Sequence, residues 1–335
     1  MSLKFAIEKL MRHEDLGSTT CQEAFAEMLT DTCSPLQTSV FLGLLRAKPE
    51  TAEEILSIVA FLKTKMLPVP SKHTTLDIVG TGGDGANTVN ISTGSALLAA
   101  SCGIKVAKHG NRAVSSQAGA ADVLEALGIN IHLSSEKISQ SIDQYGFGFC
   151  YSPNFHPALL TLKNLRKELN IPTTFNLLGP LLNPAHARHY LLGVLHETLA
   201  PVMARALQQT GTPRSMVVHG CGLDEISTAG VTTLLEITPT EIKTSQLNPT
   251  ELGFAPCSMD DLRGGNAITN AQLLRSSFEG KRGALSDTLI LNTAVALKIY
   301  GCYESIPEAI AYASDTLYSG AALKRLKQLI QFSHE

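Results

Sequence analysis

The chain has 335 residues, of which 44% are hydrophobic and 17% charged, and its net charge at pH 7 is −3. This length is sufficient for one large and one smaller domain, and the slight negative charge argues against non-specific nucleic-acid binding, which usually needs a basic surface. The seven cysteines include no C-x-x-C pair, and no apolar run reaches the roughly 18 residues of a membrane span. We therefore expect a cytoplasmic protein without disulfides, a zinc site or a transmembrane helix.

The first seventy residues contain helix signals only. A helical pattern at residues 3–11 is followed by capping-box patterns at Thr20-x-x-Glu23, Ser34-Pro35-x-Gln37 and Thr51-x-x-Glu54. Each of them precedes apolar residues at helical spacing. Residues 1–70 therefore predict a small helical domain, and the proline-rich stretch at 68–71 is typical of a linker or hinge.

From residue 76 onward, short apolar runs alternate with helical patterns. The runs predict strands at residues 76–79, 104–107, 129–132, 147–150, 190–195 and 215–218. The patterns between and after them predict helices at residues 94–101, 119–127, 135–145, 157–169, 197–209 and 289–300. This alternation predicts a large α/β domain with a mostly parallel central sheet covered by helices, formed by residues 71–169 and 186–335. A segment near 170–185 is expected to return to the helical domain.

A glycine-rich loop follows the first predicted strand. Its sequence runs from Gly80 to Gly85 as Gly-Thr-Gly-Gly-Asp-Gly, and an Asn-Ile-Ser-Thr turn follows at residues 90–93. Glycines allow positive φ and bring successive amide N–H groups close to an anion, which predicts a phosphate-binding loop. The loop also fits the G-x-G-x-x-G dinucleotide pattern, but no helix opens directly on it and the nearest downstream carboxylate, Asp122, is too distant. A tight turn without a ligand remains an alternative for this loop alone.

A second polar segment follows the second predicted strand. It runs from Lys108 to Ser116 as Lys-His-Gly-Asn-Arg-Ala-Val-Ser-Ser. Ligands of open α/β sheets bind beyond the carboxyl ends of the strands, and two cations with an amide and two hydroxyls suit a phosphate. A solvated basic loop is the alternative interpretation.

Two adjacent carboxylates, Asp224 and Glu225, follow the strand predicted at 215–218 on a glycine-containing loop. On a flexed loop both can converge on a hard cation, whereas in a strand they would point to opposite faces. Alone, the pair fits an ordinary acidic surface equally well. Beside two phosphate-type loops we favour Mg²⁺, which takes one or two carboxylates together with phosphate oxygens.

Together these motifs resemble the anthranilate phosphoribosyltransferase family. The matching segments are collinear and lie at residues 77–84, 90–93, 108–116, 175–184, 217–225 and 262–265. The resemblance implies transfer of the phosphoribosyl group of 5-phosphoribosyl 1-diphosphate to the amine of anthranilate, with release of diphosphate, in tryptophan biosynthesis. It also implies two hinged domains and a homodimer formed through the helical domains.

The same resemblance assigns site residues. The diphosphate and its sugar are expected at the glycine loop, the following turn and the second polar segment: Gly80, Gly82, Gly83, Asp84, Thr88, Asn90, Ile91, Ser92, Thr93, Lys108, His109, Gly110, Arg112, Ser115 and Ser116. Ser92, Asp224 and Glu225 would hold two Mg²⁺ ions per subunit, and Asn111 and Arg166 would contact anthranilate. The reaction requires positioning and charge neutralisation and no nucleophile, so His109 is either a general base or a residue that holds the loop.

Two positions at expected substrate contacts depart from the family pattern. Pro172 stands where the family usually has Arg, and Ala120 stands where a Ser often contacts the ligand. Each change removes a contact worth about 0.5–1.5 kcal/mol, more for a charged one.

Two other functions are alternatives to this family. One is a pyrimidine nucleoside phosphorylase, whose Lys-His-Ser-Thr-Gly-Gly loop is missing here. The other is a non-catalytic relative that binds nucleic acid, which would have lost the acidic pair and gained a basic groove.

Overall fold

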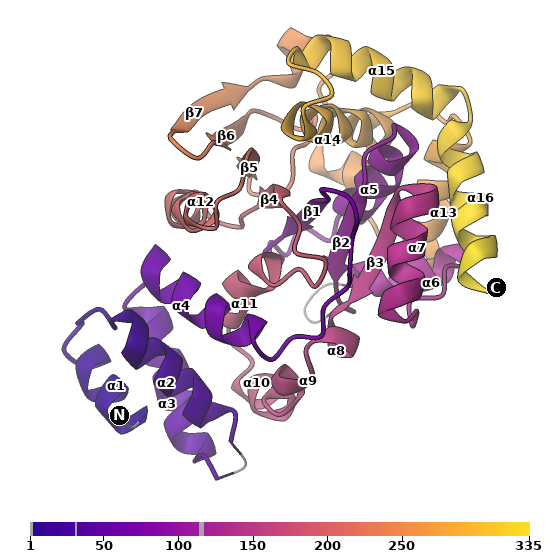
Figure 1. Cartoon of the computed structure of the whole chain (residues 1–335). Helices are drawn as coiled ribbons and strands as arrows, with labels where there is room; N and C mark the ends of the chain where they lie inside the picture. Colours follow the sequence, from indigo (N-terminus) through magenta and orange to yellow (C-terminus); the bar gives the residue numbers. More distant parts are fainter. Residues whose placement is uncertain (1–2, 31, 114–116) are drawn as a thin grey trace.

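The N-terminal part of the protein is a small helical bundle (Figure 1). The computed structural model describes residues 3–30, 32–113 and 117–335. The bundle helices are α1 (Leu3–Leu10), α2 (Ser18–Met28), α3 (Pro35–Ala47) and α4 (Ala52–Lys63). Ser34 caps α3, and Thr51 forms both bonds of the predicted capping box with Glu54. The cap predicted at Thr20 is wrong, because the Cys21 amide already bonds to the Gly17 carbonyl and Thr20 lies inside the first turn.

The larger part of the protein is built on a mostly parallel sheet, as the sequence predicts. Within the described residues this sheet has seven strands in the order β3-β2-β1-β4-β5-β6-β7. Their bounds are β1 (Leu76–Gly80), β2 (Val106–Gly110), β3 (Phe147–Tyr151), β4 (His189–Gly193), β5 (Ser215–Gly220), β6 (Thr232–Ile237) and β7 (Ile242–Leu247). The strands from β3 to β5 pair in parallel, and β6 and β7 continue the sheet in antiparallel pairing.

The strand predicted at residues 129–132 is wrong. This stretch is a loop after α6 (Ala120–Leu127), and its apolar residues Ile129 and Ile131 are buried against the core without joining a ladder. Conversely, β6 and β7 were not predicted. The side chains of β7 are mostly exposed, as is common at a sheet edge, so the strand lacks a strong apolar pattern.

Helices cover both faces of the sheet (Figure 1). The remaining α-helices are α5 (Ile91–Ser101), α7 (Ser135–Tyr145), α8 (Ser152–Phe155), α9 (Pro157–Leu160), α10 (Lys163–Leu169), α11 (Phe175–Leu178), α12 (Ala200–Gln209), α13 (Ala267–Phe278), α14 (Ala284–Tyr300), α15 (Ile306–Tyr318) and α16 (Ala321–Ser333). Short 3-10 turns lie at Gly179–Leu181, Glu197–Leu199, Pro249–Leu252 and Met259–Leu262. The helix predicted at 157–169 is interrupted between α9 and α10, where the buried Leu162 leaves helical geometry. No helix within the described ranges is long and apolar enough to cross a membrane.

The strand β4 shows how the two faces are filled. Leu191 packs into the core that contains α5 and α14, whereas Tyr190 and Leu192 face the core shared by α12 and the helical bundle. Alternate residues of a strand point to opposite faces, and β4 is buried on both. The sheet therefore contributes directly to the core beneath the bundle.

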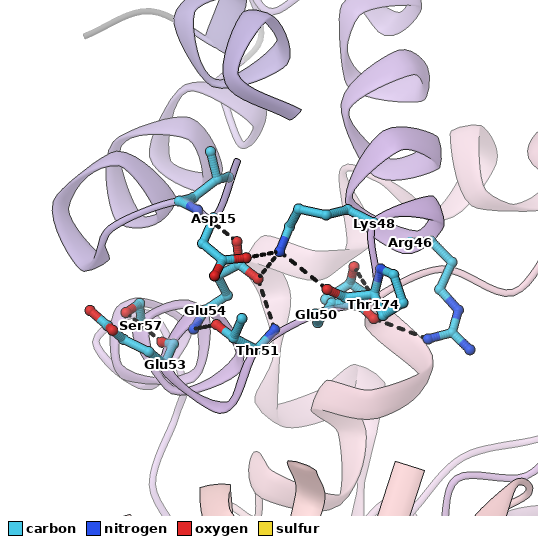
Figure 2. A network of polar contacts seen from close by, with 11 residues as sticks. Asp15, Arg46, Lys48, Glu50, Thr51, Glu53, Glu54, Ser57 and Thr174 are labelled. Atoms are coloured by element: carbon cyan, nitrogen blue, oxygen red, sulfur yellow. Dashed lines mark hydrogen bonds and ion pairs between the residues drawn. The ribbon is translucent and has the colours of Figure 1, made fainter. Parts of the chain in front are cut away.

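The segment that returns to the bundle is anchored there by packing and by charge. The ring of Phe175, at the start of α11, lies edge-on to Phe25 with centroids 5.8 Å apart. Beside it, the Thr174 hydroxyl donates to Glu50 at 2.7 Å, and Arg46 donates to the other carboxylate oxygen of Glu50 at 3.0 Å (Figure 2). These contacts tie Thr174 and Phe175 to α2 and to the loop after α3, where Arg46 of α3 also holds Glu50.

Candidate active site

The adjacent parallel strands β2, β1, β4 and β5 all end in glycine at the same edge of the sheet. These terminal residues are Gly110, Gly80, Gly193 and Gly220. A Cβ atom on Gly80 would overlap the Asp224 carboxylate, and one on Gly193 would overlap the Asp224 backbone. The missing side chains therefore let the loop after β5 lie directly over the ends of its neighbours.

The glycine loop contacts the acidic pair. The backbone amide of Gly82 donates to Asp224 Oδ2 at 2.6 Å, although 142 residues separate the two in sequence. Gly82 and Gly83 have φ values of 67° and 86°, a region that residues with a side chain rarely adopt. The predicted phosphate loop and the predicted metal carboxylates thus form one site.

The amino terminus of α5 forms a second wall of this site. Asn90 is the N-cap residue, Ile91 to Thr93 form the first turn, and the amide of Ser92 donates to Glu225 Oε1 at 3.0 Å. The first amides of a helix attract anions because they lack partners within the helix and lie at the positive end of its dipole. The turn predicted at residues 90–93 is therefore a helix start whose Ser92 N–H is directed at Glu225.

Ionisation of both Asp224 and Glu225 is unfavourable without a bound cation. Burial, followed by the carboxylate of Asp84, raises the pKa of Asp224 to about 6. Burial, followed by the charge of Asp224, raises the pKa of Glu225 to about 8. Like charges in a poorly solvated site disfavour ionisation, and a bound cation would remove that penalty.

These oxygen donors fit Mg²⁺. In residues 3–30, 32–113 and 117–335 no group of three or more His, Cys, Asp or Glu side chains has the arrangement of a metal site. Mg²⁺ needs no such group, since it commonly takes one or two carboxylates and completes its shell with water and phosphate oxygens. The pair of carboxylates beside phosphate-type N–H donors is a suitable donor set.

Lys108, the central residue of β2, is buried beneath this site. Its ammonium donates to the Ile78 carbonyl at 2.6 Å and to Ser92 Oγ at 3.3 Å, and burial lowers its pKa. The fully buried Asp77 carboxylate accepts from the His109 amide and from the Asn183 amide group. Lys108 therefore joins β1 to the start of α5 and places a positive charge close to the acidic pair.

His109 contacts a second imidazole that the sequence did not indicate. The two Nε2 atoms of His109 and His156 lie 3.2 Å apart, and His109 Nδ1 lies 3.0 Å from the Gly179 carbonyl. Burial lowers the pKa of His109 to about 3 and that of His156 to about 4, so both rings are neutral at pH 7. These contacts favour the interpretation that His109 holds the loop and the returning segment together.

The loop after β2 is shaped by carboxylates of α6. Arg112 pairs with Asp122 at 2.9 Å and with Glu125 at 2.5 Å. The second oxygen of Asp122 accepts from the amides of Ala113 and Gly119. The Arg112 guanidinium is thus already paired, and its contact with substrate stays a prediction. Of the other residues predicted here, Asn111 is exposed, Gly110 is the last residue of β2, and Ser115 and Ser116 lie outside the described residues.

Arg166, predicted to bind the acceptor, lies on α10. Its guanidinium is 4.8 Å from the centre of the Phe175 ring, and burial lowers its pKa. Among the described residues no carboxylate pairs with it and no bond joins it to the glycine loop. A partly buried, unpaired guanidinium over an aromatic ring is well suited to a planar carboxylate, but its role stays a prediction.

Sequence reasoning missed the residues that position this site from a distance. Asn270, on α13, accepts from the Gly265 amide and donates to the side chain of Asn90, which is how α13 holds the start of α5. Thr88, expected as a substrate contact, forms an isolated β-bridge with Arg263. The motif at residues 262–265 was the one signal that the sequence offered near α13. It does not reveal the contact between Asn270 and Asn90, because these two residues lie 180 positions apart.

A helical bundle joined to an α/β domain, with a phosphate-type loop against an acidic pair, defines a class of glycosyl transferase. Residues 4–65 match the model of the glycosyl transferase family helical bundle domain, and residues 72–323 match that of the glycosyl transferase family a/b domain.

Individual related proteins identify a narrower family than these two domain models do. The anthranilate phosphoribosyltransferase of Chlamydia felis is 43% identical over 93% of this chain and 92% of its own. The crystal structure of the Thermus thermophilus anthranilate phosphoribosyltransferase has a TM-score of 0.92 and 36% identity over 98% of this chain and 99% of that chain. The Saccharomyces cerevisiae enzyme in complex with phosphoribosyl diphosphate (PRPP) and Mg has a TM-score of 0.90 and 32% identity over 99% of this chain and 98% of that chain, and another of its structures contains 4-fluoroanthranilate. The chain therefore belongs to the anthranilate phosphoribosyltransferase family.

Proposed function

We propose that the protein transfers the phosphoribosyl group of PRPP to the amine of anthranilate, which gives N-(5-phosphoribosyl)anthranilate and diphosphate in tryptophan biosynthesis. One observation carries the proposal: the amides of Gly82 and Ser92, from two phosphate-type elements, both bond to the acidic pair. That arrangement would bring anion donors and cation ligands within reach of one diphosphate. The names and ligands of the relatives support the same reaction.

The leaving diphosphate and the sugar bearing it would lie between the glycine loop and the first turn of α5. Amide groups of both elements would bind the phosphate oxygens, and the buried charge of Lys108 would add to their attraction. We assign Asp84, Thr88, Asn90 and the segment from Lys108 to Ser116 to the same ligand. The chemistry needs a stabilised leaving group and an acceptor held near ribose C1, so positioning and electrostatics supply most of the rate.

We further propose that Ser92, Asp224 and Glu225 hold two Mg²⁺ ions per subunit. When bound, the ions would neutralise the charge that develops on the diphosphate. The raised pKa values of both carboxylates support this. Two neighbouring buried carboxylates are costly without a cation, and such perturbed groups cluster at functional sites. The Mg in the related yeast structure gives further support.

Arg166 and Asn111 would bind the acceptor. A guanidinium can bind the anthranilate carboxylate through two parallel hydrogen bonds and thereby direct the neighbouring amine. Because both imidazoles of the His109 and His156 pair are buried and held by their neighbours, we assign neither as general base. Pro172 follows α10 on the same segment, where its ring supplies no charge for the acceptor.

We also propose a homodimer formed through the helical bundle. Large apolar side chains of α1 and α3 are exposed: Phe5, Leu36 and Val40, with Met11 just beyond α1. Helices α1 and α3 pack side by side, so these residues belong to one part of the bundle. Sedimentation analysis tests this, because Leu36→Glu should yield monomers if the proposal is right.

A cytoplasmic location is likewise proposed, supported by cysteines that are all free within the described residues.

The reaction is tested by mixing the protein with PRPP, Mg²⁺ and anthranilate and following anthranilate fluorescence. Loss of the signal with release of diphosphate is expected. No loss at any substrate concentration would refute the proposal. Phosphorolysis of uridine or thymidine would instead indicate a pyrimidine nucleoside phosphorylase, and a salt-dependent DNA complex at physiological ionic strength would indicate a nucleic-acid-binding relative.

A further inference from the structure

A pocket lies at the opposite edge of the sheet from the active site. It has a volume of about 170 Å³, and its walls come from the end of α4, the residues that lead into β4, and the residues after α12. Its polar lining side chains are Lys63, His186, Arg188, Tyr190, Thr210 and Thr212. Because β4 begins at His189 and β5 at Ser215, this is the amino-terminal edge of the sheet. A five-residue strand spans roughly 16 Å, so the pocket is separate from the glycine-lined edge.

The pocket gathers positive charge without an acidic partner. Lys63 and Arg188 both line it, and in the part of the chain that the structure describes neither forms an ion pair with a carboxylate. Burial lowers the pKa of Lys63, and burial, followed by the charge of Lys63, lowers the pKa of His186. Lys63 is half-buried and Arg188 is exposed, so an anion between them would offset the cost of burying the Lys63 charge.

The polar groups around these cations also suit a small anion. Among the described residues the Arg188 guanidinium donates one hydrogen bond, to the Gly211 carbonyl at 3.1 Å, which leaves its other N–H groups available. The buried Thr212 donates to the Arg188 carbonyl at 2.6 Å and so fixes the backbone that carries the guanidinium. The Tyr190 hydroxyl forms no hydrogen bond with another described residue, so it can donate into the pocket. A volume of this size excludes a nucleotide but accommodates a tetrahedral oxyanion.

The pocket also spans the junction between the two parts of the protein. Lys63 is the last residue of α4, whereas Arg188 and Tyr190 belong to the α/β part, and α4 lies beside α12 (Figure 1). We propose that this pocket is a second anion-binding site, which takes a phosphate group and thereby joins the end of the helical bundle to the start of β4. The site requires no metal, and it stands whether or not the proposed transfer reaction is correct.

The test is calorimetric titration of the metal-free full-length protein with inorganic phosphate. Lys63→Gln and Arg188→Gln should each weaken the affinity of this site by about ten- to a hundredfold, the effect expected for a charged hydrogen bond. Lys65→Gln is the matched control, because Lys65 is an exposed lysine two residues further along. Phosphate bound at the active site contributes equally in all four proteins, so the difference between variants isolates the pocket.

Two further measurements complete the test. Crystals soaked in selenate should show an anomalous peak between Lys63 and Arg188, and titration with ribose 5-phosphate distinguishes a free ion from a phosphorylated metabolite as the natural source. If the wild type, Lys63→Gln and Lys65→Gln bind phosphate with the same affinity and stoichiometry, the proposal is wrong. A selenate peak confined to the glycine-lined edge would overturn it as well.

Discussion

Two buried clusters of charge in the protein differ in the signs of the charges that they bring together. In the helical bundle, Lys48 pairs with Asp15 and with Glu54, and Glu54 also accepts from the amides of Leu16 and Thr51 (Figure 2). Opposite charges meet there, and backbone donors satisfy the remaining oxygens. At the proposed active site, Asp224 and Glu225 lie beside another carboxylate and their pKa values are raised.

We propose that the difference separates charges that stabilise the fold from charges that bind the ligand. A buried charge that meets its partner within the chain is satisfied by folding alone. Lys108 offsets the like charges of Asp224 and Glu225 only in part, so a bound cation would stabilise them further, and until one binds, they oppose folding. Substitutions should therefore affect stability in the first cluster and activity in the second.

The largest expected effect is on turnover. Asp224→Asn combined with Glu225→Gln should lower kcat by about 10³-fold or more, since the groups proposed to hold the cations at the leaving group are lost. In EDTA at pH 8 the free energy of unfolding should be unchanged or higher than in the wild type, because the substitution removes ionised groups whose pKa is raised by folding. Stopped assays and urea titrations measure both quantities. A variant that loses stability and keeps its turnover would reverse the comparison.

The bundle cluster should respond in the opposite way. Glu54→Ala leaves the ammonium of Lys48 buried beside a single exposed aspartate and should lower the free energy of unfolding by about 3–5 kcal/mol. The activity of the remaining folded protein should be unchanged. Glu53→Ala is the control, because Glu53 is exposed on the same helix and its loss should change stability by about 0.5 kcal/mol at most. Equal destabilisation by both variants would contradict the assigned network.

Arg166 tests whether an unpaired charge outside the acidic site also serves a ligand. Arg166→Ala should raise the KM for anthranilate by about ten- to a hundredfold and leave the KM for PRPP nearly unchanged, because a charged hydrogen bond contributes about 1.5–3 kcal/mol. Lys167→Ala, at an exposed position of α10, should change neither. An unaltered anthranilate KM in the Arg166 variant would remove this residue from the acceptor site.

How far the sequence predicts these regions depends on whether the partners are local. The capping box of Thr51 and Glu54 was predicted because both bonds form within four residues. The glycine loop and the acidic pair were each predicted from local composition, and the parallel sheet explains why they meet. By contrast, the bonds from Thr174 to Glu50 and from Asn270 to Asn90 join distant segments, and a single sequence carries no sign of such pairs.

The His109 and His156 pair is a third arrangement, buried and neutral, and it gives the smallest expected effect. Its folded pKa values of about 3 and about 4 lie below 6.5, so between pH 6.5 and 4 the unfolded chain binds more protons than the folded one. The pair's stabilisation is complete above pH 6.5 and is lost as pH falls, at about 1.4 kcal/mol per pH unit for each imidazole.

Buried carboxylates with raised pKa titrate in the same range with the opposite sign, so the measured quantity is the difference in the slope of unfolding free energy against pH between variant and wild type. Chemical unfolding from pH 6.5 to 5 should show a shallower acid loss in His156→Gln, whereas the exposed His196→Gln should match the wild type. Identical slopes in all three proteins would mean that the imidazole pair takes up protons without unfolding.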